Sequence, residues 1–165
     1  MSLITPLLSP ECVLIDITAN NKKRIFEEAS RLFEADRGLA RDLVFDKLFA
    51  RERLGSTGLG EGVAIPHSRV EGLTEAAGAF IRLAAPIPFD ALDGCPVNLI
   101  FVLLVPHEAN ETHLRILSEL AMMFADSGFR KQLLAAPDTP SLHALLTGWQ
   151  PAPEDGDNDG SAPRS

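Results

Sequence analysis

A nearly unbroken apolar run at residues 97–105 constrains the fold of this chain more than any other feature. The run reads VNLIFVLLV, with Asn98 as its one polar residue. It is too short to cross a membrane and has the length of a strand. A strand that is apolar on both faces must be covered by other layers on both sides. Further strands are predicted at 12–15, 63–65 and 76–84.

Apolar residues at helical spacing occupy other parts of the chain. They predict helices at about 22–35, 40–51 and 113–125, and two shorter helices near 128–134 and 141–147. In the third helix we expect a buried face of Leu114, Leu117, Ala121 and Phe124. Helices, then strands, then helices again predict an α/β fold, in which a mixed central β-sheet is flanked by helices on both faces.

The length fits one domain, which we expect over residues 1–150, with a disordered acidic tail at 151–165. The tail reads PAPEDGDNDGSAPRS and has no apolar residue larger than Ala or Pro. Such a segment cannot repay the entropy lost on ordering.

Composition excludes several classes of function. The net charge of −8 argues against nucleic-acid binding, which needs a basic face. No run approaches the roughly 18–20 apolar residues of a membrane helix, so we expect no membrane insertion. The first ten residues lack the pattern of a secretory signal, so we expect a cytoplasmic protein. Cys12 and Cys95 are far apart in sequence and are interpreted as small buried hydrophobes.

The most informative segment is a glycine-rich loop that leads into a short apolar strand and a histidine. Residues 51–67 read RERLGSTGLGEGVAIPH. Glycines let backbone N–H groups approach a ligand closely, and Pro66 restricts the backbone directly before His67. We therefore expect His67 at a fixed place on the rim of the sheet. An ordinary loop histidine is the alternative that the residues alone leave open.

A second histidine, His113, follows the most apolar strand. Pro106 closes that strand, and Asn110 or Thr112 can cap the helix that comes next. His113 would then lie in the first helical turn, where free N–H groups and the helix dipole favour an anion. Two strand ends that each lead to a histidine predict a shared pocket at one edge of the sheet. A plain surface residue is the alternative for His113.

Two imidazoles in one pocket suit phosphoryl transfer. A neutral imidazole is a good nucleophile toward phosphorus at cytoplasmic pH, and a second imidazole can donate a hydrogen bond to the phosphoryl oxygens. An arginine can hold the same oxygens, and Arg51 and Arg53 precede the loop. Either arginine could instead be a solvated charge at a helix end, and we favour that interpretation for Arg53.

Other chemistries fit less well. The loop lacks the Gly-Lys-Ser/Thr of a nucleotide-binding loop, and Ser56 is not in the Gly-x-Ser-x-Gly of a hydrolase. The four histidines form no His-x-x-x-His pair, so we expect no metal site and no cofactor; a metal that bridges His67 and His113 is the alternative. His107 and His143 are interpreted as surface or helix-side residues.

Several separated motifs occur in the order of a known family. Residues 59–67, LGEGVAIPH, with Glu52 upstream, resemble the active-site signature of the fructose/mannitol class of enzyme IIA domains of the bacterial phosphotransferase system. GSTG at 55–58, and LVP at 104–106 followed by THL at 112–114, resemble the nitrogen-related regulatory branch, and FDA at 89–91 also resembles the family. The likeness spans about residues 7–147.

The resemblance implies roles for individual residues. It implies that His67 carries the phosphoryl group, with His113 as the second histidine and Arg51 assisting. Ser56 and Thr57 match loop positions of the family and are expected to contribute to binding. Ser68 departs from the family, which usually has a small Gly-like residue after the histidine; its hydroxymethyl group could crowd docking or add a hydrogen bond.

The resemblance also implies partners. In the family the phosphoryl group comes from phosphoenolpyruvate through enzyme I and a histidine phosphocarrier protein, and transport members pass it to an enzyme IIB. We expect no fused enzyme IIB or transporter here, which favours a phosphotransferase component that regulates target proteins by phosphorylation-dependent binding, without small-molecule turnover of its own. A sugar-transport enzyme IIA and a binding module without phosphoryl chemistry are the alternatives.

Overall fold

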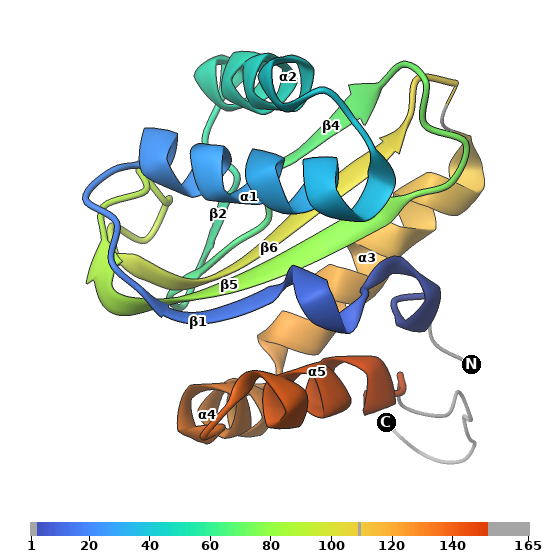
Figure 1. Cartoon of the computed structure of the whole chain (residues 1–165). Coiled ribbons are helices and arrows are strands. Elements are labelled where there is room, and N and C mark those ends of the chain that lie inside the picture. The colour runs from blue at the N-terminus through green and yellow to red at the C-terminus, as the bar shows by residue number, and fades with distance from the viewer. Residues whose placement is uncertain (1–2, 109, 152–165) are drawn as a thin grey trace, which may run out of the picture.

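A six-stranded mixed sheet lies between two layers of helices in the computed structural model, which describes residues 3–108 and 110–151 (Figure 1). The strands are β1 (Val13–Ile17), β2 (Gly58–Gly60), β3 (Val63–Ala64), β4 (His67–Val70), β5 (Ala77–Ile87) and β6 (Val97–Pro106). The helices are α1 (Lys22–Arg37), α2 (Arg41–Leu54), α3 (Glu111–Ala125), α4 (Ser127–Ala135) and α5 (Thr139–Gly148). The predicted α/β fold is confirmed, whereas the predicted tail lies, beyond Pro151, outside the described residues.

The apolar run is the central strand β6, and its residues from Leu99 to Leu104 are buried. One edge of β6 pairs antiparallel with β5, which in turn pairs parallel with β1. The other edge pairs parallel first with β3 and then with β4, so these two short strands lie end to end along β6. The run that is apolar on both faces is thus a central strand of a sheet covered on both sides, as expected.

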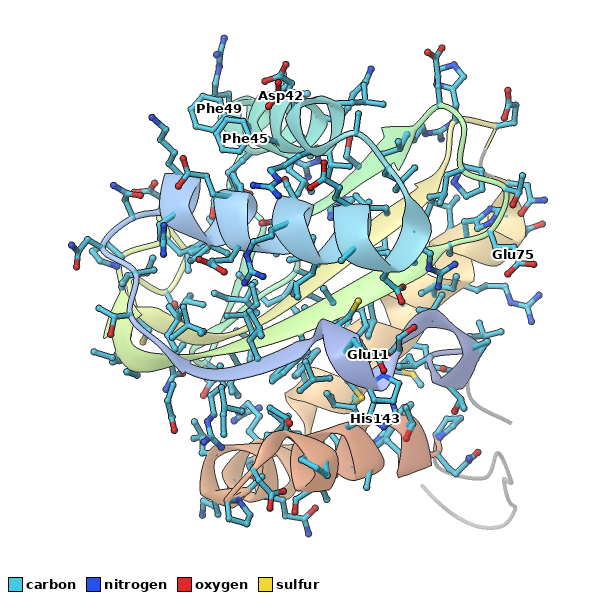
Figure 2. All side chains as sticks on the ribbon, viewed as in Figure 1. Glu11, Asp42, Phe45, Phe49, Glu75 and His143 are labelled. Carbon is cyan, nitrogen blue, oxygen red and sulfur yellow. The ribbon has the colours of Figure 1, made fainter. Side chains whose placement is uncertain are left out.

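Helices cover each face of the sheet, with α1 and α2 on one side and α3, α4 and α5 on the other (Figure 1). On the first side, α1 and α2 also pack on each other through Phe26 and Phe49, and Phe45 stacks on Phe49 (Figure 2). On the second side, the ring of Phe124 in α3 stacks on Phe80 of β5 at 6.2 Å and meets Phe101 of β6 at 6.5 Å. Aromatic packing therefore joins α1 to α2 in the first layer and α3 to the sheet in the second.

The buried face of α3 differs from the predicted one. Ile116, Leu120, Met123 and Phe124 are buried, whereas Leu114 is 59% exposed and Ala121 is exposed. The helix contains two apolar stripes that share Phe124. The stripe that continues through Leu120 is the buried one, while Leu117 of the other stripe is half-buried and packs against the core. The predicted buried face was therefore wrong at Leu114 and Ala121 and confirmed at Phe124, with Leu117 at its margin.

The glycine-rich segment is also more regular than predicted. Its second half forms β2, which turns back antiparallel onto β3. The turn needs a left-handed backbone at Gly60, Glu61 and Gly62, with φ of 98°, 58° and 82°, a conformation that glycine adopts at little cost. The chain then resumes pairing as β4, so His67 is the first residue of a strand and not a residue beyond the end of one.

The two cysteines have different environments. Cys12 is buried, as expected, and burial together with nearby Asp36 raises the pKa of its thiol to about 12. Cys95 is exposed, so the prediction of a buried thiol there was wrong. It lies before β6 in a turn where its backbone N–H donates to the Asp93 carboxylate at 3.0 Å. Within residues 3–108 and 110–151 no helix is long and apolar enough to cross a membrane.

Candidate functional site

A cavity of about 530 Å³ opens where the C-terminal half of α2, strand β4, the end of β6 and the start of α3 come together. Its volume is in the range of small ligand pockets. Its lining is Lys47, Ala50, Arg51, Leu54, His67, Ser68, Arg69, Leu103, Val105, His107, His113, Leu114 and Leu117. The structure thus brings the predicted residues His67, His113 and Arg51 into one cavity.

His67 is half-buried at the start of β4, with its backbone paired to Leu103 of β6. Pro66 has no N–H, but its carbonyl accepts a hydrogen bond from Leu103 N at 2.9 Å, so the chain stays attached to β6 immediately before the histidine. Nδ1 of His67 lies 2.8 Å from the Ile65 carbonyl oxygen. A carbonyl can only accept, so Nδ1 carries the hydrogen and Nε2 keeps its lone pair.

The surroundings of His67 keep its imidazole neutral. Burial lowers the pKa of His67 below its ordinary value, and the positive charge of Arg51 also lowers it. The hydrogen bond to Ile65 and the negative charge of Glu52 oppose this shift without reversing it. At neutral pH, Nε2 is therefore available as a nucleophile.

His113 is fixed in the other tautomer. It is the third residue of α3, and its Nδ1 accepts a hydrogen bond from the backbone N–H of Asn110 at 3.1 Å. In return, the Asn110 carbonyl accepts from the backbone N–H of His113 at 3.0 Å. This reciprocal pair resembles a capping box with histidine in place of glutamate. Because Nδ1 accepts, the neutral ring carries its hydrogen on Nε2 and can donate there.

The two arginines before the glycine-rich loop lie in different places. Arg51 is in the last turn of α2, lines the cavity, and donates to the Gly55 carbonyl from Nη1 at 2.8 Å. Arg53 does not line the cavity; its guanidinium lies 5.6 Å from the centre of the Phe49 ring. Arg53 is exposed, which agrees with its interpretation as a charge at a helix end.

Ser56 and Thr57 do not line the cavity. The Ser56 hydroxyl donates to the Phe89 carbonyl at 2.6 Å. Thr57 is buried, and its hydroxyl donates to Glu52 Oε1 at 2.6 Å. Both hydroxyls are thus used inside the fold. Ser68 does line the cavity, where its Oγ lies 3.3 Å from the carbonyl of the next residue.

Sequence reasoning missed three polar residues of the cavity, namely Lys47, Arg69 and His107. Lys47 lies four residues before Arg51 on the same helix, so helical spacing could have indicated it. Arg69 follows His67 by two positions and could have been found only if β4 had been predicted. Its Nη1 donates to the His107 carbonyl at 3.1 Å, which joins β4 to the end of β6. His107 is exposed, as predicted, and also contributes to the lining of the cavity.

His143 lies on α5, far along the chain from the other histidines of interest. Its Nε2 is 2.9 Å from the Leu8 carbonyl, and the ring points from α5 toward the N-terminal segment (Figure 2). It does not line the cavity. Within the described ranges 3–108 and 110–151, no group of three or more His, Cys, Asp or Glu side chains is placed to hold a metal ion.

The cavity is an island of positive charge on an acidic protein. None of its lining residues is Asp or Glu, and Lys47, Arg51 and Arg69 have no carboxylate within 4.0 Å among the residues that the structure describes. Cations outside the cavity that do pair with carboxylates are Lys22, Arg24, Arg31, Arg37, Arg41, Arg82 and Arg130. Unpaired cations around two imidazoles are suited to binding an anion.

Comparison with known proteins identifies a family for this chain. Residues 6–148 match the family described as "Phosphoenolpyruvate-dependent sugar phosphotransferase system, EIIA 2". A nitrogen regulatory protein of Pseudomonas aeruginosa is 40% identical over 151 residues, which cover 87% of this chain and 94% of that protein. The crystal structure of nitrogen regulatory protein IIA-Ntr from Neisseria meningitidis is 49% identical, with a TM-score of 0.84 over 88% of this chain and 100% of that one.

A more distant structure shares the fold. The complex of enzyme IIAMtl with phosphorylated enzyme IIBMtl from Escherichia coli contains a chain that is 18% identical, with a TM-score of 0.72 over 87% of this chain and 100% of that one. The family match covers most of the chain, and the nitrogen regulatory relative from Pseudomonas aeruginosa is 40% identical over nearly its whole length. The chain therefore belongs to the EIIA 2 family of the phosphoenolpyruvate-dependent sugar phosphotransferase system.

Proposed function

We propose that this protein is a phosphocarrier that accepts a phosphoryl group on Nε2 of His67. The observation that carries the proposal is the 2.8 Å contact between His67 Nδ1 and the Ile65 carbonyl, in a cavity with unpaired cations. That contact leaves the lone pair of Nε2 available for attack. Burial keeps the pKa of His67 low, so the ring is neutral when the donor arrives.

The transfer step balances without a further reactant. The Nε2 lone pair attacks the phosphorus of a phosphohistidine that is protonated on its other ring nitrogen, and the P–N bond of the donor breaks. The donor ring leaves as neutral imidazole with the electron pair of that bond. His67 becomes the phosphorylated, positively charged ring, and the Ile65 carbonyl stabilises its Nδ1–H.

The remaining polar residues of the cavity hold the phosphoryl oxygens. His113 donates from Nε2–H because its Nδ1 is already an acceptor. Arg51 supplies a planar charged donor, and Lys47 and Arg69 add positive charge. The transition state of phosphoryl transfer mainly needs positioning and charge stabilisation, which these groups supply. Ser56 and Thr57 have no part in this step because their hydroxyls are used inside the fold.

We further propose that the donor is a histidine phosphocarrier protein in the cytoplasm and that the phosphorylated state controls binding to target proteins. The nitrogen regulatory proteins that this chain resembles favour a regulatory role over sugar transport. A phosphoryl group adds about −1.5 to −2 charges, which would reverse much of the positive charge of the cavity and so change what docks there. Transfer to an enzyme IIB remains the competing role, as in the mannitol complex.

The experiment is reconstitution with phosphoenolpyruvate, enzyme I and a histidine phosphocarrier protein, followed by intact-protein mass spectrometry. We expect one acid-labile phosphoryl group on the wild type and none on His67→Ala that remains folded by circular dichroism. His143→Gln is the matched control, because that histidine is outside the cavity, and it should be labelled normally. Labelling of His67→Ala would contradict the proposal, and an added enzyme IIB that removes the label would identify the transport role.

A further inference from the structure

A buried carboxylate lies directly behind the cavity, in the last turn of α2. Glu52 is 7% exposed, and three donors surround it. Its Oε2 accepts from Lys22 Nζ at 2.9 Å and from the Thr57 backbone N–H at 3.0 Å, and its Oε1 accepts from the Thr57 hydroxyl at 2.6 Å. Glu52 thus ties the first residue of α1 to the end of α2 and to the segment that enters β2.

The segment held by Glu52 is the one that orients His67. The Thr57 carbonyl accepts a hydrogen bond from the Ile65 N–H at 3.0 Å, and the Ile65 carbonyl fixes Nδ1 of His67 at 2.8 Å. Glu52 also directly follows Arg51 in α2. One carboxylate therefore restrains both the strand that sets the imidazole and the helical turn that carries the guanidinium.

Lys22 is well fixed and does not line the cavity. Its ammonium lies between Glu52 at 2.9 Å and Asp90 at 3.3 Å, and 4.7 Å from the centre of the Phe89 ring. Phe89 is in turn hydrogen-bonded to the loop that contains Thr57, because its carbonyl accepts from the Ser56 hydroxyl. The contacts of Lys22 therefore connect it to the site through Glu52 and the loop.

We propose that Lys22 is a positioning residue for the phosphoryl acceptor, which it holds through the chain of contacts Lys22–Glu52–Thr57–Ile65–His67. The kinetic part of this proposal, the effect of Lys22 on the rate of phosphoryl acceptance, rests on the proposed function. Its structural part, the coupling of Lys22 to the imidazole of His67, stands apart from phosphoryl transfer.

The coupling has an electrostatic component with a definite sign. Glu52 raises the pKa of His67, and Lys22 compensates the charge of Glu52. Removal of the ammonium leaves a buried carboxylate without its counter-charge, which favours protonated His67. The other charged or titratable groups around His67 are Lys47 and Arg51 of α2, Arg69 of β4, His107 after β6, and His113 of α3. All of these groups are present in both the wild type and Lys22→Met.

The test compares Lys22→Met with Lys23→Met. The second lysine is adjacent, exposed and equal in charge, so it is a matched control. We expect Lys22→Met to slow single-turnover phosphoryl acceptance by about ten- to a hundredfold, as small misplacements of reacting groups do. The donor concentration for half-maximal rate should not change, because Lys22 is outside the cavity. Lys22→Arg should restore most of the rate by keeping the ion pair.

The second readout is the titration of the His67 ring by NMR in the unphosphorylated protein. Lys22→Met should raise the pKa of His67 and move the pH profile of acceptance to higher pH, whereas Lys23→Met should do neither. In the double variant Lys22→Met/Glu52→Gln, the pKa of His67 should return below that of Lys22→Met, since the buried charge is gone. Lys22→Gln, which can still donate to Glu52, replaces Lys22→Met if that variant does not fold.

An unchanged pKa of His67 and a wild-type rate in Lys22→Met would overturn the proposal. A lower melting temperature of Lys22→Met with an unchanged pKa of His67 would also overturn it, because the ion pair would then contribute to stability alone. If the wild type accepts no phosphoryl group but the pKa shift appears, the proposed function fails and the positioning of the imidazole by Lys22 stands.

Discussion

At the scale of single residues, backbone groups hold the two imidazoles of the cavity in opposite tautomers. The Ile65 carbonyl accepts a hydrogen bond from Nδ1–H of His67, whereas the Asn110 N–H donates a hydrogen bond to Nδ1 of His113. One ring is therefore left with a lone pair at Nε2 and the other with a hydrogen there. A nucleophile and a donor arise from the same side chain because the backbone partner differs.

His113 should have two separable roles. His113→Ala should slow phosphoryl acceptance by about ten- to a thousandfold through loss of a donor, and should lower the free energy of unfolding by about 1 kcal/mol through loss of the cap of α3. His113→Glu should recover stability, because a glutamate at this position can accept from the Asn110 N–H. It should stay slow, since a carboxylate repels the phosphoryl group.

Urea denaturation and rapid-quench transfer measure the two roles of His113 independently. Transfer at the wild-type rate by His113→Glu would show that this histidine serves only as a cap. Equal stability of all three proteins would instead remove the capping role and leave the donor role in place.

Chemical type and spacing made His67, His113, Arg51 and Arg53 candidates, and the family resemblance implied roles for the first three. The structure places these three in one cavity. The sequence could not indicate that Ser56 and Thr57 use their hydroxyls on Phe89 and Glu52, because those bonds depend on where distant segments pack. The local sequence of a glycine-rich loop does not show whether a hydroxyl faces a ligand or the protein interior.

At the scale of elements, a buried arginine joins the sheet to α4. Arg82 of β5 is 8% exposed, and its Nη1 lies 2.9 Å from the Leu133 carbonyl, 3.3 Å from that of Leu134 and 2.8 Å from that of Ala136. Its Nη2 lies 3.3 Å from Asp16 Oδ1. The last carbonyls of a helix have no partner within the helix, so this guanidinium supplies the C-terminal cap of α4.

Arg82→Met should therefore destabilise the protein by about 2–4 kcal/mol, because several buried acceptors lose their donor. Hydrogen exchange should locate the loss in α4 more than in β6. The control is Arg41→Met, which removes an exposed pair with Glu34 and should cost roughly 0–1 kcal/mol. Similar losses in the two variants, measured by urea denaturation, would refute the capping role of Arg82.

The sequence predicted the existence of nearly every long element but missed β2 and β4, and it predicted Leu114 and Ala121 of α3 as buried although both are exposed. Pro66 looks like the end of a strand because it cannot donate, yet its carbonyl and the residues after it continue to pair with β6. In α3 both apolar stripes have helical spacing. Phe124, which contacts Phe80 and Phe101, belongs to both stripes, so the choice between them depends on how the rest of the domain covers the helix.

At the scale of the whole molecule, strand order could not be derived from local pattern. β3 and β4 share one edge of β6 although they precede it in sequence by more than 25 residues, and this arrangement puts His67 beside the end of β6 and the start of α3. Parallel pairing between distant strands depends on the packing of the whole domain. The sequence predicted a shared pocket from two neighbouring strand ends. His67 reaches the pocket in another way, as the first residue of β4, which pairs with the last part of β6.

Charge is also distributed on the scale of the whole molecule. The chain carries −8 overall, so its average field repels anions, whereas the cavity has three cations without carboxylate partners among residues 3–108 and 110–151. Inorganic phosphate should therefore bind at the cavity and stabilise the protein, even though most of the surface disfavours it. At ten times its dissociation constant, phosphate should add about 1.4 kcal/mol, or about 3–6 °C in melting temperature for a domain of this size. Chloride at equal ionic strength should add much less.

Two double variants test whether the cavity is the binding site. Lys47→Met/Arg69→Met should lose most of the stabilisation by phosphate. Lys23→Met/Lys131→Met, with the same change in net charge outside the cavity, should keep it. An equal gain in both double variants, measured by differential scanning fluorimetry, would mean that phosphate acts on the protein generally and that the cavity has no particular affinity for it.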